Sequence, residues 1–363
     1  MYQTLRPLIF RLRPEAAHNL TVALLRASGA LPPAAALLRA QFRPAQPSAP
    51  VRAFGLTFAN PLGLAAGYDK DGLAWRGLAA LGFGHIEVGT VTVRPQGGNP
   101  GPRVFRIPES EAVINRMGFP NRGAEFVARR LSGPRPVGLV LGVNIGKNKD
   151  TPLEEAGQDY TSLIRTFAPL ADYLAVNISS PNTPGLRALQ SGPALEALLR
   201  DLRAARLEMA RALGRTVPIL LKLAPDQTHA QLVDAVGAIR QAGMDGIILS
   251  NTTLRRDGLA SPLAAESGGM SGKPLRAHAT ALLREVVDLT RGRFPIIAAG
   301  GVVSPEDALE KLETGATLVQ VYTGLIYRGP ALVKAILEHP AFRPAAAPAS
   351  VGARQGIPQE SQS

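Results

Sequence analysis

The chain has 363 residues, contains no cysteine and carries a formal net charge of +12. Without cysteine, disulfide frameworks, thiolate zinc sites, iron–sulfur clusters and cysteine nucleophiles are excluded, and the five histidines are too scattered to indicate a metal centre. The basic charge comes mostly from arginines spread along the chain, which is typical of a solvated surface, although a basic protein that binds nucleic acid remains an alternative.

Residues 1 to about 45 are predicted to form a basic, amphipathic helical hairpin. One apolar stripe consists of Leu5, Leu8, Ile9 and Leu12, and a second, after Arg13-Pro14, consists of Leu20, Ala23, Leu24 and Ala27. Up to Arg43 this segment has six arginines and a single acidic residue, Glu15. Such a hairpin either packs on the rest of the protein or lies on an anionic membrane surface.

This first segment indicates neither secretion nor a membrane-spanning helix. Arg6, Arg11 and Arg13 interrupt every apolar run before the core of a signal peptide could form. No apolar stretch approaches the roughly 18 residues that a spanning helix needs. We therefore expect the protein on the cytoplasmic side, either dissolved or lying on a membrane.

Eight short apolar runs follow along the chain, separated by helical patterns. They are Asn60–Gly67, His85–Val91, Leu139–Ile145, Tyr173–Ser179, Pro218–Ala224, Gly246–Thr252, Pro295–Gly301 and Leu318–Gly324. Their near-continuous apolar character, without strict alternation, indicates strands that are buried on both faces, as in parallel sheets.

The helical patterns between these runs complete a series of β/α units. Clear examples cover residues 194–213, 230–241 and 275–289, and Ser304-Pro305 is a typical helix start. Eight such units predict an α/β fold, a TIM (β/α)₈ barrel with an N-terminal helical extension. A doubly wound open sheet is the weaker alternative.

The expected domain organisation has three parts. Residues 1–45 are the helical hairpin with a proline-rich linker, and residues 46–343 are the barrel. Residues 344–363 are small and polar and contain prolines, so we expect a disordered tail there.

Polar residues or glycines stand at the ends of the strands, which in a barrel converge on the face that carries active sites. They are Lys70, Asp71, Thr90, Asn144, Lys147, Asn177, Ser179, Ser180, Ser250, Asn251, Thr252, Gly300, Gly301, Tyr322, Thr323 and Gly324. Any one of these could be a simple loop cap. Lys222, inside the fifth run, must meet an anion or lose its charge, and a structural ion pair is its alternative explanation.

The glycines after the last two strands indicate a phosphate site. Gly300-Gly301 and Gly324 lie where barrels hold a phosphate on backbone amides, although a glycine pair could also be only a tight turn. The residues alone therefore predict a barrel enzyme with a phosphorylated cofactor, a buried cation and an amide-rich pocket. They do not name the reaction.

Six segments resemble the signature segments of dihydroorotate dehydrogenases, in order along most of the chain. They are residues 65–70 (AAGYDK), 115–119 (NRMGF), 143–149 (VNIGKNK), 177–183 (NISSPNT), 271–275 (SGKPL) and 296–301 (IIAAGG). This resemblance implies an FMN enzyme that oxidises dihydroorotate to orotate in pyrimidine synthesis. Ser180 stands where the family has its catalytic base, at a position that is usually cysteine in the soluble relatives. With the N-terminal extension, this serine implies the membrane-associated, quinone-reducing class.

The resemblance also implies roles for individual residues. A serine hydroxyl is a weak base, so Ser180 needs activation, with Thr183 and a water passing its proton on and Phe119 closing the route. The implied substrate-binding residues are Lys70, Asn115, Arg116, Met117, Gly118, Phe119, Asn177, Asn182, Asn251 and Thr252. Asparagine suits this task because its amide both donates and accepts hydrogen bonds.

A second implied set binds the FMN. Its members are Ala66, Gly67, Tyr68, Asp69, Lys70, Thr90, Asn144, Asn177, Lys222, Ser250, Gly272, Gly301, Tyr322 and Thr323. Lys222 would stabilise the negative charge that develops on flavin reduction. Tyr68 departs from the family pattern, in which an apolar residue is expected.

In the quinone-using relatives, the N-terminal hairpin forms a tunnel for the lipid-soluble acceptor. His18 and Arg103 match residues that line it. The implied partners are dihydroorotate, a membrane quinone and the membrane surface, without nucleic acid, at the cytoplasmic face of the cell membrane. Two alternatives stay open, namely a soluble flavin barrel with another electron acceptor and a basic barrel that binds nucleic acid.

Overall fold

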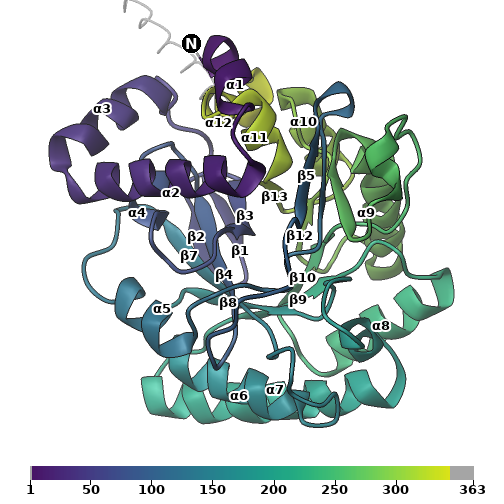
Figure 1. The fold of residues 1–363 in the computed structure, drawn as a ribbon. Helices are drawn as coiled ribbons and strands as arrows, with labels where there is room; N and C mark the ends of the chain where they lie inside the picture. Colours follow the sequence, from purple (N-terminus) through teal and green to yellow (C-terminus); the bar gives the residue numbers. More distant parts are fainter. Residues whose placement is uncertain (1, 344–363) are drawn as a thin grey trace, which may run out of the picture.

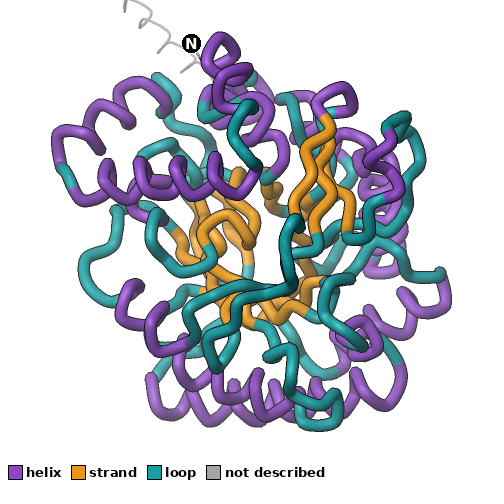
Figure 2. The backbone as a smooth tube through the Cα atoms, in the orientation of Figure 1, coloured by secondary structure: helices purple, strands orange, loops and turns teal. Residues whose placement is uncertain are grey.

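A closed barrel of eight parallel strands forms the centre of the computed structural model, which describes residues 2–343 (Figures 1 and 2). In order around the barrel, the strands are β3 (Leu62–Asp69), β4 (His85–Val91), β7 (Val140–Ile145), β8 (Tyr173–Asn177), β9 (Ile219–Leu223), β10 (Gly246–Leu249), β12 (Ile296–Ala299) and β13 (Leu318–Val321). All eight predicted strands are confirmed. The barrel closes through parallel pairing of β13 with β3, so the open-sheet alternative is wrong.

Helices surround the barrel and cover the outer face of its strands (Figure 1). They are α4 (Trp75–Ala79), α5 (Ala124–Leu131), α6 (Ala156–Phe167), α7 (Gly192–Leu213), α8 (His229–Gln241), α9 (Arg276–Thr290), α10 (Pro305–Glu313), α11 (Thr323–Arg328) and α12 (Ala331–Glu338). The predicted start of α10 is confirmed, because the Ser304 side chain accepts a hydrogen bond from the amide of Asp307.

Two small antiparallel sheets close the two ends of the barrel. The hairpin of β1 (Val51–Ala53) and β2 (Leu56–Phe58) packs Phe58 onto the residues at which the barrel strands begin. The other sheet consists of β5 (Val104–Ile107), β6 (Ala112–Asn115) and β11 (Gly269–Gly272) and belongs to the opposite end. The sequence analysis did not predict either sheet.

Three helices precede the barrel: α1 (Tyr2–Ile9), α2 (Pro14–Ala30) and α3 (Pro32–Phe42). Helix α2 lies so close to α4 that a Cβ atom at Gly77 would come within 2.0 Å of the Leu25 carbonyl oxygen, so this contact requires glycine. Helix α1 packs beside α11, where the Arg6 guanidinium donates to the carbonyl of Tyr327 over 3.1 Å (Figure 1). The predicted N-terminal extension is thus helical and attached to the barrel.

The outer face of these helices is apolar and exposed. Seven leucines lie there with 42–68% of their surface accessible: Leu5, Leu8, Leu12, Leu20, Leu24, Leu31 and Leu37. Val22, Leu25, Leu38 and Phe42 face the other way and pack against the core. Packing on the barrel therefore accounts for only one face of the hairpin. The domain boundaries stay predictions, and the expected tail, 344–363, lies outside the described residues.

None of the described helices is by itself long and apolar enough to cross a membrane. Helices α2 and α3 meet the length and composition criteria only as a pair, with a bend of 110° between them.

Candidate active site

One large cavity connects the N-terminal helices with the strand ends of the barrel. Its volume is about 340 Å³. The helices α1 to α3 and the turn before α2 contribute Tyr2, Ile9, Phe10, Pro14, Glu15, Ala17, His18, Thr21, Leu25, Leu38 and Phe42 to its wall. The rest of the wall comes mainly from residues at the carboxyl ends of the strands. The fold thus places the hairpin over the face of the barrel where catalytic groups gather.

Most of the predicted site residues line this one cavity. They are His18, Ala66, Gly67, Tyr68, Lys70, Thr90, Asn115, Met117, Gly118, Phe119, Asn177, Ser180, Asn182, Lys222, Ser250, Asn251, Thr252, Gly272, Gly301, Tyr322 and Thr323. Their convergence from distant parts of the chain agrees with the prediction of a single site. Their individual roles remain predictions.

Five predicted site residues lie outside the cavity wall. The carboxylate of Asp69 accepts the amides of Leu73 and Ala74 at the start of α4. The guanidinium of Arg116 pairs with Glu266 over 2.7 Å.

The other three stand just behind the wall. Arg103 pairs with the cavity residue Glu15 over 2.9 Å, and Asn144 lies behind Asn177. Thr183 is buried, and its hydroxyl has no hydrogen-bonding partner among the described residues. A buried hydroxyl without a protein partner usually forms a hydrogen bond with a water or with a ligand group.

A hydrogen-bonded network fixes the amide-rich part of the wall. Asn177, at the end of β8, donates through Nδ2 to Thr90 Oγ1 and to Asn144 Oδ1, each over 3.0 Å. Asn144 in turn donates to Glu87, which also accepts from Tyr173 and from Gln320. Because each member is held by the next, the orientation of the Asn177 amide is defined before any ligand binds.

The loops after β8 and β10 place further polar groups beside Asn177. Asn251 donates to Ser179 Oγ over 2.9 Å, and Ser179 Oγ donates to Asn177 Oδ1 over 3.0 Å. The hydroxyl of Ser180 accepts the amide of Asn182 over 3.2 Å. Ser180 is buried and faces the cavity, so its hydroxyl is shielded from bulk water.

Lys222 contributes a buried amine to the wall of the cavity. It lies in the middle of the buried strand β9, and its ammonium group forms no hydrogen bond or ion pair with another described residue. Burial lowers the pKa of its ammonium group, and the carboxylate of Glu87 opposes that shift. The alternative explanation, a structural ion pair, is not supported, so the lysine is available to an anionic ligand.

The glycines beyond β12 and β13 form a cradle of backbone. A Cβ atom at Gly301 would come within 2.3 Å of the Arg276 Cα atom, and one at Gly324 within 2.3 Å of the Val302 carbonyl oxygen. The backbone amides of Gly301, Thr323 and Gly324 donate to no other described residue. Backbone N–H groups without an internal acceptor can donate hydrogen bonds to the oxygens of a phosphate group.

An aromatic contact links the hairpin to this cradle. The Tyr68 ring lies edge-on to His18, with 5.4 Å between centroids, and also to Tyr322, with 6.0 Å. Burial, with a smaller contribution from the positive charge of Lys70, lowers the pKa of His18 to about 3. His18 is therefore neutral at physiological pH and presents no charge to an apolar molecule in the cavity.

Lys70 also lines the cavity. Its ammonium group donates to the Gly67 carbonyl over 2.6 Å. Burial lowers its pKa from 10.5 to about 8, and the carboxylates of Asp71 and Glu15 limit that shift. The ammonium form, which attracts a carboxylate, is thus lost as the pH rises through about 8.

If the cavity binds orotate, as the family resemblance implies, that binding should depend on this titration. The dissociation constant of orotate should be constant below about pH 7 and should rise by up to about tenfold per pH unit above the pKa of Lys70, near 8. Equilibrium dialysis between pH 6 and 9.5 measures it. The Lys70→Gln chain should bind more weakly and show a flat profile. An unchanged profile in that variant would assign the titration to another group.

Several residues of the site were not predicted. Glu15, Arg106, Ser271 and Gln320 line the cavity. Glu87 was also missed, although an acidic residue inside a buried strand carries the same signal as Lys222. No described group of histidine, cysteine and acidic residues could hold a metal ion.

This chain is similar over most of its length to dihydroorotate dehydrogenases. The sequence profile of the family described as dihydroorotate dehydrogenase matches residues 48–340. A relative from Roseiflexus castenholzii named dihydroorotate dehydrogenase (quinone) is 49% identical, over 93% of this chain and 90% of the relative. A relative of the same name from Stutzerimonas stutzeri is 50% identical, over 92% and 96%.

Solved structures show the same similarity. The DHODH of Eimeria tenella in complex with ferulenol superimposes with a TM-score of 0.81 at 36% identity, covering 89% of both chains. Its ligand-free form gives a TM-score of 0.80 at 38% identity, covering 89% of this chain and 92% of the other.

Proposed function

This chain belongs to the dihydroorotate dehydrogenase family, and we propose that it oxidises dihydroorotate to orotate in pyrimidine biosynthesis, with a membrane quinone as the final electron acceptor. One observation carries the proposal. A single cavity joins Ser180 and the strand-end asparagines to the unpaired Lys222 and to the N-terminal helices. Such a cavity serves both a small polar substrate and an apolar acceptor.

The family is flavin-dependent, and the residues of this chain fit FMN. A bound flavin supplies the hydride acceptor that the oxidation needs. Among the described residues, the buried ammonium group of Lys222 has no hydrogen-bonding partner, which suits the flavin ring, whereas the glycine cradle at Gly301 and Gly324 suits a phosphate. Thr90, Asn177 and Ser250 would hold the ring and its side chain, with Asn144 supporting them from behind the wall.

Ser180 is our candidate for the base that removes the substrate proton. The amide of Asn182 donates to its hydroxyl oxygen and thereby stabilises the negative charge that develops there. Burial keeps bulk water from competing for the proton. The unpartnered hydroxyl of Thr183 offers the next acceptor outward, by way of a water, and Phe119 would control that route.

The strand-end amides would recognise the substrate ring. Asn177 and Asn251 are held by the network described above, and Asn182 donates to Asn115 over 3.3 Å. The Thr252 hydroxyl is buried without a partner among the described residues, and Thr252 lines the cavity, so a substrate group would satisfy this hydroxyl. Lys70 would bind the carboxylate, and Met117 and Gly118, which line the cavity, would contact the ring.

The N-terminal helices would lead the quinone to the flavin. His18, neutral and half-buried, lines the cavity from α2 and packs against Tyr68, and Arg103 holds the same helix through Glu15. The exposed leucines would rest in the lipid, with the arginines of the segment near anionic headgroups. The protein would then be a peripheral protein on the cytoplasmic side of the cell membrane.

An acceptor assay tests this function. Formation of orotate from dihydroorotate should depend on a soluble benzoquinone, whereas NAD⁺ and fumarate should support less than a tenth of that rate. Faster turnover with NAD⁺ or fumarate would favour the soluble alternative. If the flavin-containing protein forms no orotate with any of the three acceptors, the proposed reaction is wrong.

The glycine cradle gives a further prediction for the cofactor. Gly301→Ala should lower FMN affinity by more than about tenfold, because the new Cβ atom meets the Arg276 backbone and moves the amides that bind phosphate. FMN per chain after dialysis measures this. Gly292→Ala is the matched control, since Gly292 has a similar φ of +64° but nothing within 4 Å of its Cβ position. Equal FMN loss in both variants would argue against the phosphate site.

A further inference from the structure

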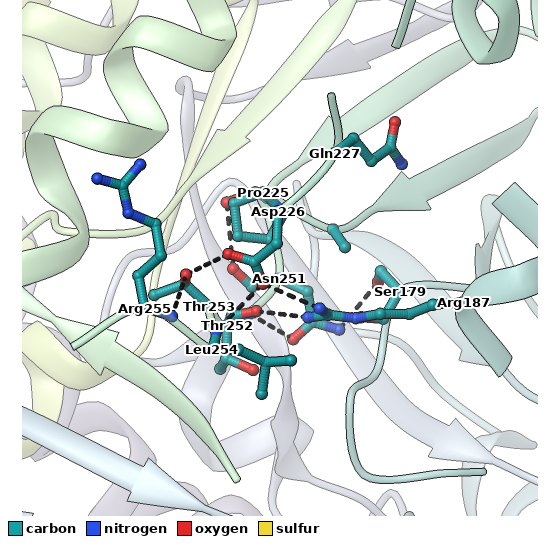
Figure 3. Close-up of polar contacts among 12 residues, drawn as sticks. Ser179, Arg187, Pro225, Asp226, Gln227, Asn251, Thr252, Thr253, Leu254 and Arg255 are labelled. Atoms are coloured by element: carbon teal, nitrogen blue, oxygen red, sulfur yellow. Dashed lines mark hydrogen bonds and ion pairs between the residues drawn. The ribbon is translucent and has the colours of Figure 1, made fainter. Parts of the chain in front are cut away.

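An arginine–aspartate pair lies next to residues that line the cavity, and Figure 3 shows its polar contacts. Arg187 belongs to a short 3₁₀ helix (Leu186–Gln190) after β8, and Asp226 follows β9. Arg187 Nη1 and Asp226 Oδ2 are 2.9 Å apart, and the two side chains are only 22% and 16% exposed. Neither residue lines the cavity, so neither would touch the substrate.

The remaining donors of Arg187 hold two backbone carbonyls of the proposed active site. Nε donates to the carbonyl of Ser179 and Nη2 to the carbonyl of Thr252, each over 3.0 Å (Figure 3). The first carbonyl belongs to the peptide bond that enters Ser180. The second belongs to the peptide bond that leaves Thr252. One planar guanidinium therefore fixes the backbone beside the base and beside a substrate-binding residue.

Asp226 extends this connection into the loop after β10. Its carboxylate accepts the hydroxyl of Thr253 and, over 3.0 Å, the amide of Leu254 (Figure 3). Strands β8, β9 and β10 are neighbours in the barrel, and the Arg187–Asp226 pair joins the loops that follow all three. Hydrogen bonds between charged groups and the backbone are stronger than neutral ones, so these loops are held as one unit.

We propose that Arg187 is a positioning residue for the oxidation of dihydroorotate, acting through Ser180 and Thr252. The inference rests on the proposed function, in which Ser180 is the base. The only hydrogen bond of the Ser180 side chain to a described residue comes from the neighbouring amide of Asn182, so the hydroxyl follows the backbone of its own loop. If Arg187 no longer holds the Ser179 carbonyl, the base moves relative to the substrate ring. A misplacement near 1 Å can slow a reaction by about 10²-fold.

A matched pair at the other end of the barrel separates positioning from stability. Arg206 and Asp245 are 2.8 Å apart with side chains 21% and 26% exposed, close to the values of the Arg187–Asp226 pair. Arg206 also donates to the carbonyl of Gly243, and Asp245 accepts the amide of Ile219. This second pair joins the beginnings of β9 and β10, far from the strand ends that carry the site.

The experiment compares Arg187→Lys with Arg206→Lys in the full-length, flavin-loaded protein. Lysine keeps the positive charge but cannot donate to two carbonyls and a carboxylate in a planar arrangement. Anaerobic stopped flow measures flavin reduction by saturating dihydroorotate, and double mixing measures reoxidation by a soluble quinone. In Arg187→Lys we expect reduction to slow by about 10- to 100-fold while reoxidation stays within twofold of the unchanged chain. In Arg206→Lys both rates should stay within twofold.

Other outcomes would overturn the proposal. If Arg187→Lys reduces at the unchanged rate, or if reduction and reoxidation fall in proportion, the pair has only a structural role. If the unchanged chain is itself not reduced by dihydroorotate, the proposed function fails rather than the positioning role. Should Arg187→Lys not fold, Asp226→Asn replaces it, and a selective loss of at least fivefold in reduction is required.

Discussion

Ser180→Ala should bind FMN and orotate normally and yet be reduced by dihydroorotate at least about 10²-fold more slowly, the scale of general-base catalysis. Ser180 lies in the cavity wall, buried, beside Asn177 and Asn182, where a proton can be taken from a bound ring. The substitution removes one oxygen and leaves no large gap. Stopped-flow reduction without oxygen measures the effect.

The second half-reaction of the Ser180→Ala protein, reoxidation by a quinone, is the control for this experiment. Once Ser180→Ala has been reduced chemically, a soluble quinone should reoxidise it at the rate of the unchanged chain, because Ser180 takes no part in that half-reaction. Orotate affinity should change by less than about threefold, since Ser180 contributes no charge to the carboxylate. Near-normal reduction by dihydroorotate would assign the base to another residue of the cavity.

Removal of residues 1 to about 42 should strongly slow reoxidation by a long-chain quinone while leaving reduction by dihydroorotate intact. Eleven of the cavity residues come from this segment, yet none of them is a strand-end group that would handle the substrate. We expect reoxidation by the long-chain quinone to slow by more than about 10²-fold, because the acceptor is no longer oriented at the flavin. Reoxidation of the shortened chain at the full rate would contradict the tunnel.

Deletion also exposes barrel surface that Leu25 and Phe42 cover. A variant that keeps the helices in place is therefore needed to test whether the segment binds a membrane. Replacing Leu8, Leu24 and Leu37 by glutamine changes side chains that are 61–68% exposed and should not alter the fold. Sedimentation with anionic vesicles should be lost.

The control for this variant replaces exposed apolar residues elsewhere on the surface. Val137, Leu207 and Leu254 are also exposed, and their replacement by glutamine should leave sedimentation unchanged. Equal vesicle binding by both variants would show that the leucines of the hairpin do not contact the membrane.

The barrel could be predicted because its strands are buried on both faces, which makes each of them a continuous apolar run. Strands β5, β6 and β11 escaped prediction because they do not belong to a β/α unit of the barrel. Length was not the reason, since the predicted strands β10, β12 and β13 also have four residues each. Strand β6 pairs with β11 across more than 150 positions of sequence, as in the pair Val113 and Ser271. Local periodicity carries no information about such pairing.

The cavity wall could be predicted from polar residues at strand ends, but the residues behind the wall could not. Arg187 is one of many arginines in an arginine-rich chain, and nothing near it in sequence shows that its guanidinium meets the carbonyls of Ser179 and Thr252. In the hairpin, periodicity located the apolar stripes. It could not tell which leucines face the barrel and which remain exposed, because both faces of α2 carry leucine.

The most direct test of the account is the visible spectrum of the purified full-length protein, followed without oxygen. We predict the absorption of one FMN per chain, bleaching on addition of dihydroorotate with release of orotate, and recovery of the colour on addition of a quinone. A colourless protein that takes up no FMN, or a yellow protein whose spectrum dihydroorotate leaves unchanged, would contradict it.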